Sequence, residues 1–170
     1  MNRRTALALA VAAGLLLASA SPAGAVPAES TSAAAGSSNG IVYVGSFTKN
    51  GNRGVEYKAW HRFEIAGGWY KFSLHKKATF KGRDITWTNA WTTFDSTSAF
   101  NYNGVKASSN GKARSSGVQY AWSFRKAHFQ FCAGECFNYY PEIKLSIYAC
   151  KGDAGNWPNG CGDAEYRTAG

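Results

Sequence analysis

Three histidines, His61, His75 and His128, are the residues best suited to acid–base chemistry. A general acid or base must face a substrate, and His61 instead shares the sequence parity of apolar neighbours, which favours a core histidine. His75 lies among lysines and His128 beside an expected bulge, and neither has an acidic neighbour in sequence. His-Glu-x-x-His and phosphate-cradling glycine loops are absent. We therefore predict no catalytic residues and no cofactor, and keep as an alternative a small secreted hydrolase or toxin whose site joins histidines to distant acids.

The chain contains four cysteines, and their spacing favours two local disulfides over a redox or zinc site. Ala133-Gly134-Glu135 is typical of a three-residue hairpin loop, which would place Cys132 opposite Cys136. The same register would pair Phe131 with Phe137 and Phe129 with Tyr139. Cys150 and Cys161 are then left to bond with each other. Zinc sites usually repeat a close Cys-x₂₋₄-Cys pair downstream, and here only Cys132 and Cys136 are that close. The Cys-x-x-Cys motif of redox proteins is absent.

The segment 151–165, which overlaps the loop closed by Cys150 and Cys161, is rich in oxygen donors. Such donors can hold calcium, but their spacing is not that of an EF-hand. We predict a polar, disulfide-closed turn and no metal. A disulfide-fixed loop would also suit an inhibitor of extracellular proteases, which is a second alternative function. The donors are Asp153, Asn156, Asn159, Asp163 and Glu165.

Three tryptophans are candidates for ligand contact. Trp87 and Trp91 point the same way in an extended strand, with Asn89 between them. An exposed pair could stack sugar rings or bases, whereas burial in the core is the interpretation favoured by the size of the rings. Trp60 is the one large aromatic on the polar side of its own strand, so it is the better single candidate for an exposed contact.

A basic stretch over 75–83 contains Lys76, Lys77, Lys81 and Arg83. Residues 41–131 hold 14 Lys and Arg and four Asp and Glu, whereas residues 132–170 hold three and five. Such a surface should attract an anionic polymer or carbohydrate at the cell surface, or else serve only to keep the protein soluble. Strand alternation would put Lys77, Lys81 and Arg83 on one face and Lys76 on the other. Gly82 and the Lys76-Lys77 pair instead indicate that part of the stretch is a loop, in which case all four cations should reach solvent.

The N-terminal 25 residues are typical of a secretory signal peptide. Arg3-Arg4 precedes a 13-residue apolar run, Ala6 to Ala18, and Ala23-x-Ala25 resembles a cleavage site. Cleavage after Ala20 is the alternative. The run is too short to span a membrane comfortably, so we predict a secreted, extracellular protein without a transmembrane segment. Cleavage after Ala25 would lower the formal net charge from +9 to +7.

Residues 26–40 are rich in Ala, Ser and Gly and are predicted to form a disordered leader to a single β domain over 41–170. The dominant period in that domain is two. Val55 to Ile65 places apolar residues at odd positions, and 70–74 and 143–147 alternate in the same way.

Asn-Gly occurs five times, at Asn39, Asn50, Asn103, Asn110 and Asn159. Because Asn-Gly suits a type I′ hairpin turn, the pairs at 103 and 110 predict a three-strand meander over 98–124. Its last strand would put Val118, Tyr120, Trp122 and Phe124 on one face. The opposite parity of Phe129 and Phe131 then predicts a bulge near 125–127.

These patterns predict an all-β fold, an antiparallel β-sandwich or small barrel of about eight or nine short strands. We expect an exported, non-catalytic protein that acts by binding outside the cell or at its surface. The sequence indicates neither the ligand nor the oligomeric state.

Overall fold

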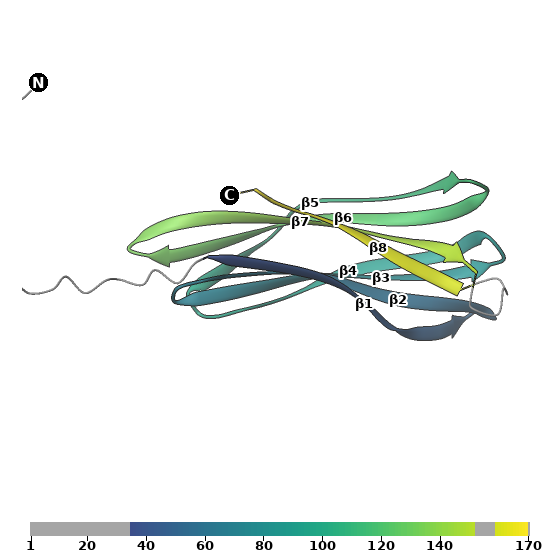
Figure 1. Cartoon of the computed structure of the whole chain (residues 1–170), viewed down its shortest axis with the longest axis horizontal. Coiled ribbons are helices and arrows are strands. Elements are labelled where there is room, and N and C mark those ends of the chain that lie inside the picture. Colours follow the sequence, from purple (N-terminus) through teal and green to yellow (C-terminus); the bar gives the residue numbers. More distant parts are fainter. Residues whose placement is uncertain (1–34, 152–158, 170) are drawn as a thin grey trace, which may run out of the picture. The chain divides into compact units, whose positions relative to one another are not determined.

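The computed structural model describes residues 35–151 and 159–169 as an all-β domain of two antiparallel four-stranded sheets (Figure 1). Sheet A has the strand order β1-β2-β3-β4 and sheet B the order β5-β6-β7-β8, so each sheet is a simple meander of consecutive strands. The strands are β1 (Gly36–Lys49), β2 (Asn52–Ile65), β3 (Gly68–Lys81), β4 (Asp84–Ser96), β5 (Phe100–Ser115), β6 (Val118–Ala133), β7 (Glu135–Cys150) and β8 (Asn159–Ala169). The described part of the chain contains no helix long and apolar enough to cross a membrane.

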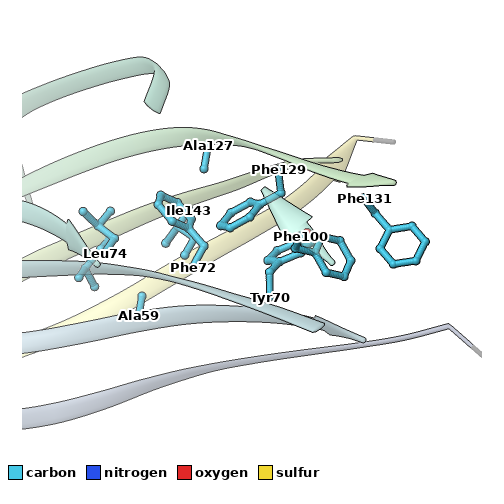
Figure 2. Close-up of a cluster of buried hydrophobic side chains, with 10 residues drawn as sticks. Ala59, Tyr70, Phe72, Leu74, Phe100, Ala127, Phe129, Phe131 and Ile143 are labelled. Carbon is cyan, nitrogen blue, oxygen red and sulfur yellow. The ribbon is translucent and has the colours of Figure 1, made fainter. Parts of the chain in front are cut away.

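The two sheets face one another across a core of alternating inward residues, as in a β-sandwich (Figure 2). Tyr70 of β3 stacks on Phe129 of β6, with ring centroids 4.2 Å apart. The predicted inward positions of 55–65, 70–74 and 143–147 are confirmed: Ala59, Phe72 and Leu145 have no exposed surface. Separate edges at β1, β4, β5 and β8 make this a pair of sheets and not a closed barrel.

Tight turns connect neighbouring strands, and residues with positive φ stand in each of the first five hairpins described. Asn50 and Gly51 have φ of 52° and 73°, as a type I′ turn requires, and they lie between the paired residues Lys49 and Asn52. Ser116 and Gly117 form the corresponding turn between β5 and β6. Each meander needs such turns because the chain reverses direction between consecutive strands of a sheet.

The predicted meander over 98–124 is wrong. Residues 100–115 form one continuous strand, β5, which pairs with β6 along its length. Gly104, with φ of 89°, lies within a register shift between Tyr102 and Val105, and so it forms a bulge and not a hairpin turn. The Asn110-Gly111 pair continues the ladder, with Gly111 opposite Trp122.

The inward face of β6 is also the reverse of what the aromatic residues indicated. Ala121, Ser123, Ala127, Phe129 and Phe131 are all buried and all odd, so the strand keeps one parity. The expected bulge near 125–127 lies instead in β5, opposite Ala127. Tyr120, Trp122 and Phe124 face outward, whereas Val118 at the start of the strand packs against a buried apolar cluster.

The first strand begins before residue 41, the predicted start of the β domain. Strand β1 starts at Gly36, so the last five residues of the predicted 26–40 leader pair with β2. Strand β8 occupies 159–169 and completes sheet B. The strands hold 11 to 16 residues, longer than the short strands expected.

Candidate functional site

The outer face of sheet A carries five aromatic side chains that point away from the core. Trp60 pairs with Ser73, and His75 pairs with Trp91, so even residues of β2 and odd residues of β3 and β4 share this face. This shared parity places four of the six tryptophans on the outer face of sheet A. We call this surface the aromatic face; its rings are Phe47, Trp60, Trp69, Trp87 and Trp91.

Each ring of the aromatic face lies beneath a cation. Lys49 Nζ is 3.8 Å from the ring centroid of Trp87, and Lys71 Nζ is 4.8 Å from that of Trp60. The Arg62 guanidinium carbon is 4.7 Å from the Trp69 centroid. Lys77 Nζ lies 5.3 Å from the Trp91 centroid and 5.5 Å from that of Phe47. Because the ring face carries negative potential, each contact holds a flexible cation in a limited range of positions.

Acids neutralise only part of this charge. Arg62 pairs with Glu64 at 2.9 Å and Lys77 with Glu56 at 3.1 Å. Within the described ranges, no carboxylate forms an ion pair with Lys49, Lys58 or Lys71. These three lysines therefore carry the uncompensated positive charge of the aromatic face.

His75 lies at the centre of the aromatic face and contacts three neighbours. Its ring stacks on Trp91 at 4.9 Å, Nδ1 is 3.2 Å from Glu56 Oε1, and Nε2 is 3.2 Å from Thr93 Oγ1. The order carboxylate–histidine–hydroxyl is that of a relay activating a nucleophile. Glu56 also pairs with Lys77, however, so the same contacts tie three strands together.

The expectation that Trp87 and Trp91 fill the core is wrong, since both are half-buried on the outer face. Small residues occupy the inward positions of β4, including Thr88, Ala90 and Thr92. Trp60 faces outward as expected. A glycine makes room for it: a Cβ on Gly40, its cross-strand partner, would lie 2.7 Å from the indole.

The basic stretch does not form one exposed cluster. Lys76 is 1% exposed and faces the core, so the expectation that it reaches solvent is wrong. Strand β3 continues through the stretch to Lys81, and alternation therefore turns Lys76 inward and Lys77 outward. Lys81 is exposed at the end of β3, and Arg83 is exposed in the turn before β4.

Buried Lys76 interrupts the core. Its ammonium donates to Ser123 Oγ at 2.8 Å, and these two residues stand between two separate apolar clusters. Burial, followed by the charges of Arg125 and Lys112, lowers the pKa of Lys76 to about 8. Among the described lysines and arginines, Lys76 therefore combines almost complete burial with a strongly lowered pKa.

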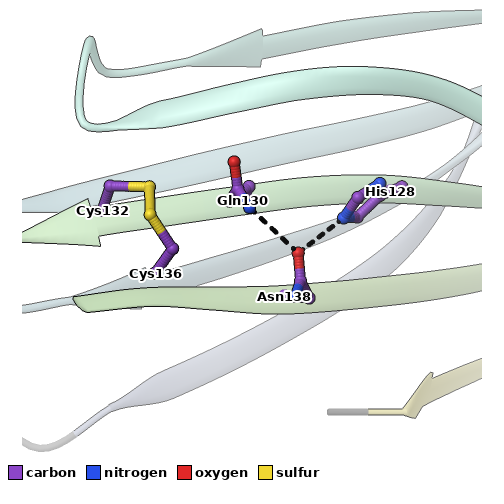
Figure 3. The surroundings of a disulfide bond; sticks show 5 residues. All are labelled: His128, Gln130, Cys132, Cys136 and Asn138. Carbon is purple, nitrogen blue, oxygen red and sulfur yellow. Dashed lines mark hydrogen bonds between the residues drawn. A yellow bond between two sulfur atoms is a disulfide. The ribbon is translucent and has the colours of Figure 1, made fainter.

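The other histidines occupy structural positions. His61 is 2% exposed, as its parity predicted, and its Nδ1 lies 2.5 Å from Asn39 Oδ1. Burial lowers its pKa to about 4, so the ring is neutral at pH 7. His128 stacks on Tyr140 and its Nε2 contacts Asn138 Oδ1, which Gln130 also approaches (Figure 3).

Both predicted disulfides are confirmed, Cys132–Cys136 and Cys150–Cys161. The first joins directly opposed residues of β6 and β7 (Figure 3), and the predicted pairs Phe131–Phe137 and Phe129–Tyr139 hold. Of the predicted oxygen-rich loop, Asp153 and Asn156 lie outside the described residues. Asp163 and Glu165 belong to β8, where Glu165 pairs with Lys144.

In the described ranges, no three His, Cys, Asp or Glu side chains form a group able to hold a metal ion. Trp69, Phe47, Lys49, Arg62 and Lys71 belong to the aromatic face, although sequence reasoning did not select them. Strand parity could have placed Trp69 and Lys71 beside His75 and Lys77. The positions of Phe47 and Lys49 depend on the β1–β2 register, which no local pattern indicates.

No family model matches this chain, and the searches of curated proteins and of solved structures find no match.

Proposed function

We propose that the protein is exported and binds an anionic polymer, such as an acidic polysaccharide at a cell surface, through the aromatic face of sheet A. The observation that carries this proposal is the pairing of rings with cations across one sheet face. The two disulfides are compatible with an extracellular setting. The signal peptide predicted over 1–25 lies outside the described residues.

An anionic ligand fits this face better than a neutral sugar. A sugar ring stacks on a bare aromatic face, but Lys49 and Lys71 already lie over Trp87 and Trp60. A negatively charged group can bind those cations without displacing them. Because the rings hold the ammonium groups, less side-chain freedom is lost when the ligand binds.

The spacing of the cations favours an extended ligand over a small one. Lys49 belongs to β1, Lys58 to β2 and Lys71 to β3, so the uncompensated charges spread across neighbouring strands about 4.8 Å apart. They also lie at different heights along the strands. By register, Lys49 is level with Asn52 of β2 and Lys71 is level with Arg62, so the three lysines span on the order of 30 Å along the strands. A chain that carries repeated anionic groups can contact several of them at once, whereas a small ion cannot.

Retention on immobilised heparin tests the proposal. The triple variant Lys49→Gln, Lys58→Gln, Lys71→Gln should elute at lower salt than the parent protein. The matched control, Lys106→Gln, Lys151→Gln, Arg167→Gln, removes the same charge from exposed residues outside the aromatic face. The control should lose much less retention. Equal losses would mean that net charge alone governs binding and would refute the assignment to this face.

A hydrolase is the second candidate function, favoured by the Glu56–His75–Thr93 contacts. None of the described pockets is lined by these residues, and the relay lies on an open sheet face. Hydrolysis of a small ester that disappears in Thr93→Ala, with heparin retention unchanged, would support the hydrolase. The absence of such hydrolysis would leave the three residues as a structural contact.

The third candidate, a protease inhibitor acting through the loop closed by Cys150–Cys161, depends on residues 152–158, which lie outside the described residues. No contact described here favours it.

A further inference from the structure

A polar pocket of about 190 Å³ lies between the two sheets, at the side where β4 and β5 form their edges. Residues from β3, β4, β5 and β6 line it, and a buried lysine forms part of its wall. Every polar lining residue can donate a hydrogen bond, and none of those described is acidic. They are Lys76, Thr88, Asn89, Asn110, Ser123 and Arg125.

The pocket concentrates positive charge without a counter-ion. Lys76 has 1% exposure, and none of the described ion pairs includes it. Lys112 and Arg125 are close enough to perturb its titration, and both are cations. A charge buried without compensation costs several kcal/mol, so the folded chain gains stability if an anion enters.

Hydrogen-bonding capacity also remains unused in this pocket. An ammonium has three donors, and Lys76 has one acceptor in the described part of the chain, Ser123 Oγ. The Arg125 guanidinium makes all of its described hydrogen bonds through Nη1, to Phe124 O, Asn110 Oδ1 and Ser109 O. The remaining N–H groups of both side chains are available to a ligand.

We propose that this pocket binds a tetrahedral oxyanion, phosphate or sulfate, between Lys76 and Arg125, with Ser123 as a further donor. Its volume accommodates such an ion with several waters, since one water occupies about 30 Å³ of liquid. The oxyanion could be free in solution or a terminal ester group on a larger molecule. This inference does not depend on the aromatic face, because no residue of that face's ring–cation pairs lines the pocket.

Calorimetric titration of the full chain with inorganic phosphate, at constant ionic strength in chloride, tests the proposal. We expect saturable binding by the parent protein, at least tenfold weaker binding by Lys76→Met, and a similar loss in Arg125→Gln. Lys106→Gln, an exposed β5 variant, should bind as the parent does. At ten times the dissociation constant, phosphate should raise the melting temperature by about 4–7 °C.

Two variants keep the test decisive. If Lys76→Met fails to fold, Arg125→Gln still removes one of the two proposed cationic partners. Phosphate and sulfate also stabilise proteins through exclusion from their surfaces, and that effect is expected in every variant. Absence of saturable binding in the parent protein, or equal binding in all variants, would overturn the proposal.

A competition arm identifies the source of the anion. A sulfated disaccharide that displaces phosphate from the parent protein would indicate that the pocket accepts an ester group of a larger molecule. Failure to compete, together with saturable phosphate binding, would assign the site to the free ion.

Discussion

The pH dependence of stability should report the buried charge of Lys76. Burial in the folded chain lowers the pKa of Lys76 to about 8, from the ordinary lysine value of 10.5. Between these values the unfolded chain binds more protons than the folded one, so the free energy of unfolding must rise as pH increases. The opposite slope would require a folded-state pKa above 10.5.

The shift corresponds to about 3 kcal/mol over the whole window, at about 1.4 kcal/mol for each pH unit. About 2 kcal/mol of this should be gained between pH 7 and pH 9.5. Measurements should stop there. Burial raises the pKa values of Tyr57, Tyr102 and Tyr166. Because these phenols ionise more readily in the unfolded chain, the free energy of unfolding should fall as pH rises above about 10.

Lys76→Met isolates the effect. Its stability should be nearly constant from pH 7 to 9.5, because the titrating group is gone. The absolute free energy of unfolding of Lys76→Met at pH 7 is a poorer readout, because two effects oppose each other. The variant no longer pays for burying a charge, but it leaves Ser123 without its hydrogen-bond partner, which costs about 1–3 kcal/mol.

Urea denaturation at half-unit pH intervals, in chloride and without phosphate or sulfate, measures the difference. Parallel pH profiles for the parent protein and Lys76→Met would refute the reasoning, because they would show that Lys76 does not titrate in this range. The profile of Lys106→Gln should follow the parent.

Three further outcomes are expected in denaturation experiments. His61, with its pKa lowered to about 4, should cost the protein stability as pH falls from 6.5 towards 4, by up to about 3 kcal/mol, and His61→Gln should flatten that limb of the pH profile. Replacing Cys150–Cys161 by alanines should cost about 3 kcal/mol and replacing Cys132–Cys136 about 2 kcal/mol, since the first closes the longer loop; equal costs would contradict the loop-length argument. Gly162→Val should destabilise by about 1–3 kcal/mol, because its Cβ would lie 2.6 Å from the Tyr57 ring, and an unchanged urea midpoint would contradict that packing.

The period of two predicted the strands and their shared faces well, because one face of β2, β3 and β7 is apolar and the other polar. It failed for β6, where both faces are partly apolar. There Trp122 and Phe124 look like core residues, while small Ala121 and Ser123 fill the inward positions opposite bulky side chains. Period alone tells which residues share a face, but not which face is buried.

Local signals also misplaced two Asn-Gly pairs. Asn50-Gly51 forms its turn because its flanking residues pair without a bulge, whereas Gly104 adopts positive φ inside a bulged strand. Both conformations suit glycine, so composition cannot distinguish them. Lys76 was misplaced for a different reason: its partner Ser123 is 47 residues away, and no short-range pattern announces that contact.

The most direct test of the aromatic face uses its own tryptophans. Trp60, Trp69, Trp87 and Trp91 lie on this face, whereas Trp122 lies on the outer face of sheet B. In a ¹H–¹⁵N NMR titration with a heparin oligosaccharide, we expect the indole N–H signals of those four residues to shift, the shifts to diminish as salt rises, and the Trp122 signal to stay in place. Shifts confined to Trp122, or of equal size at all five indoles, would contradict binding at the aromatic face.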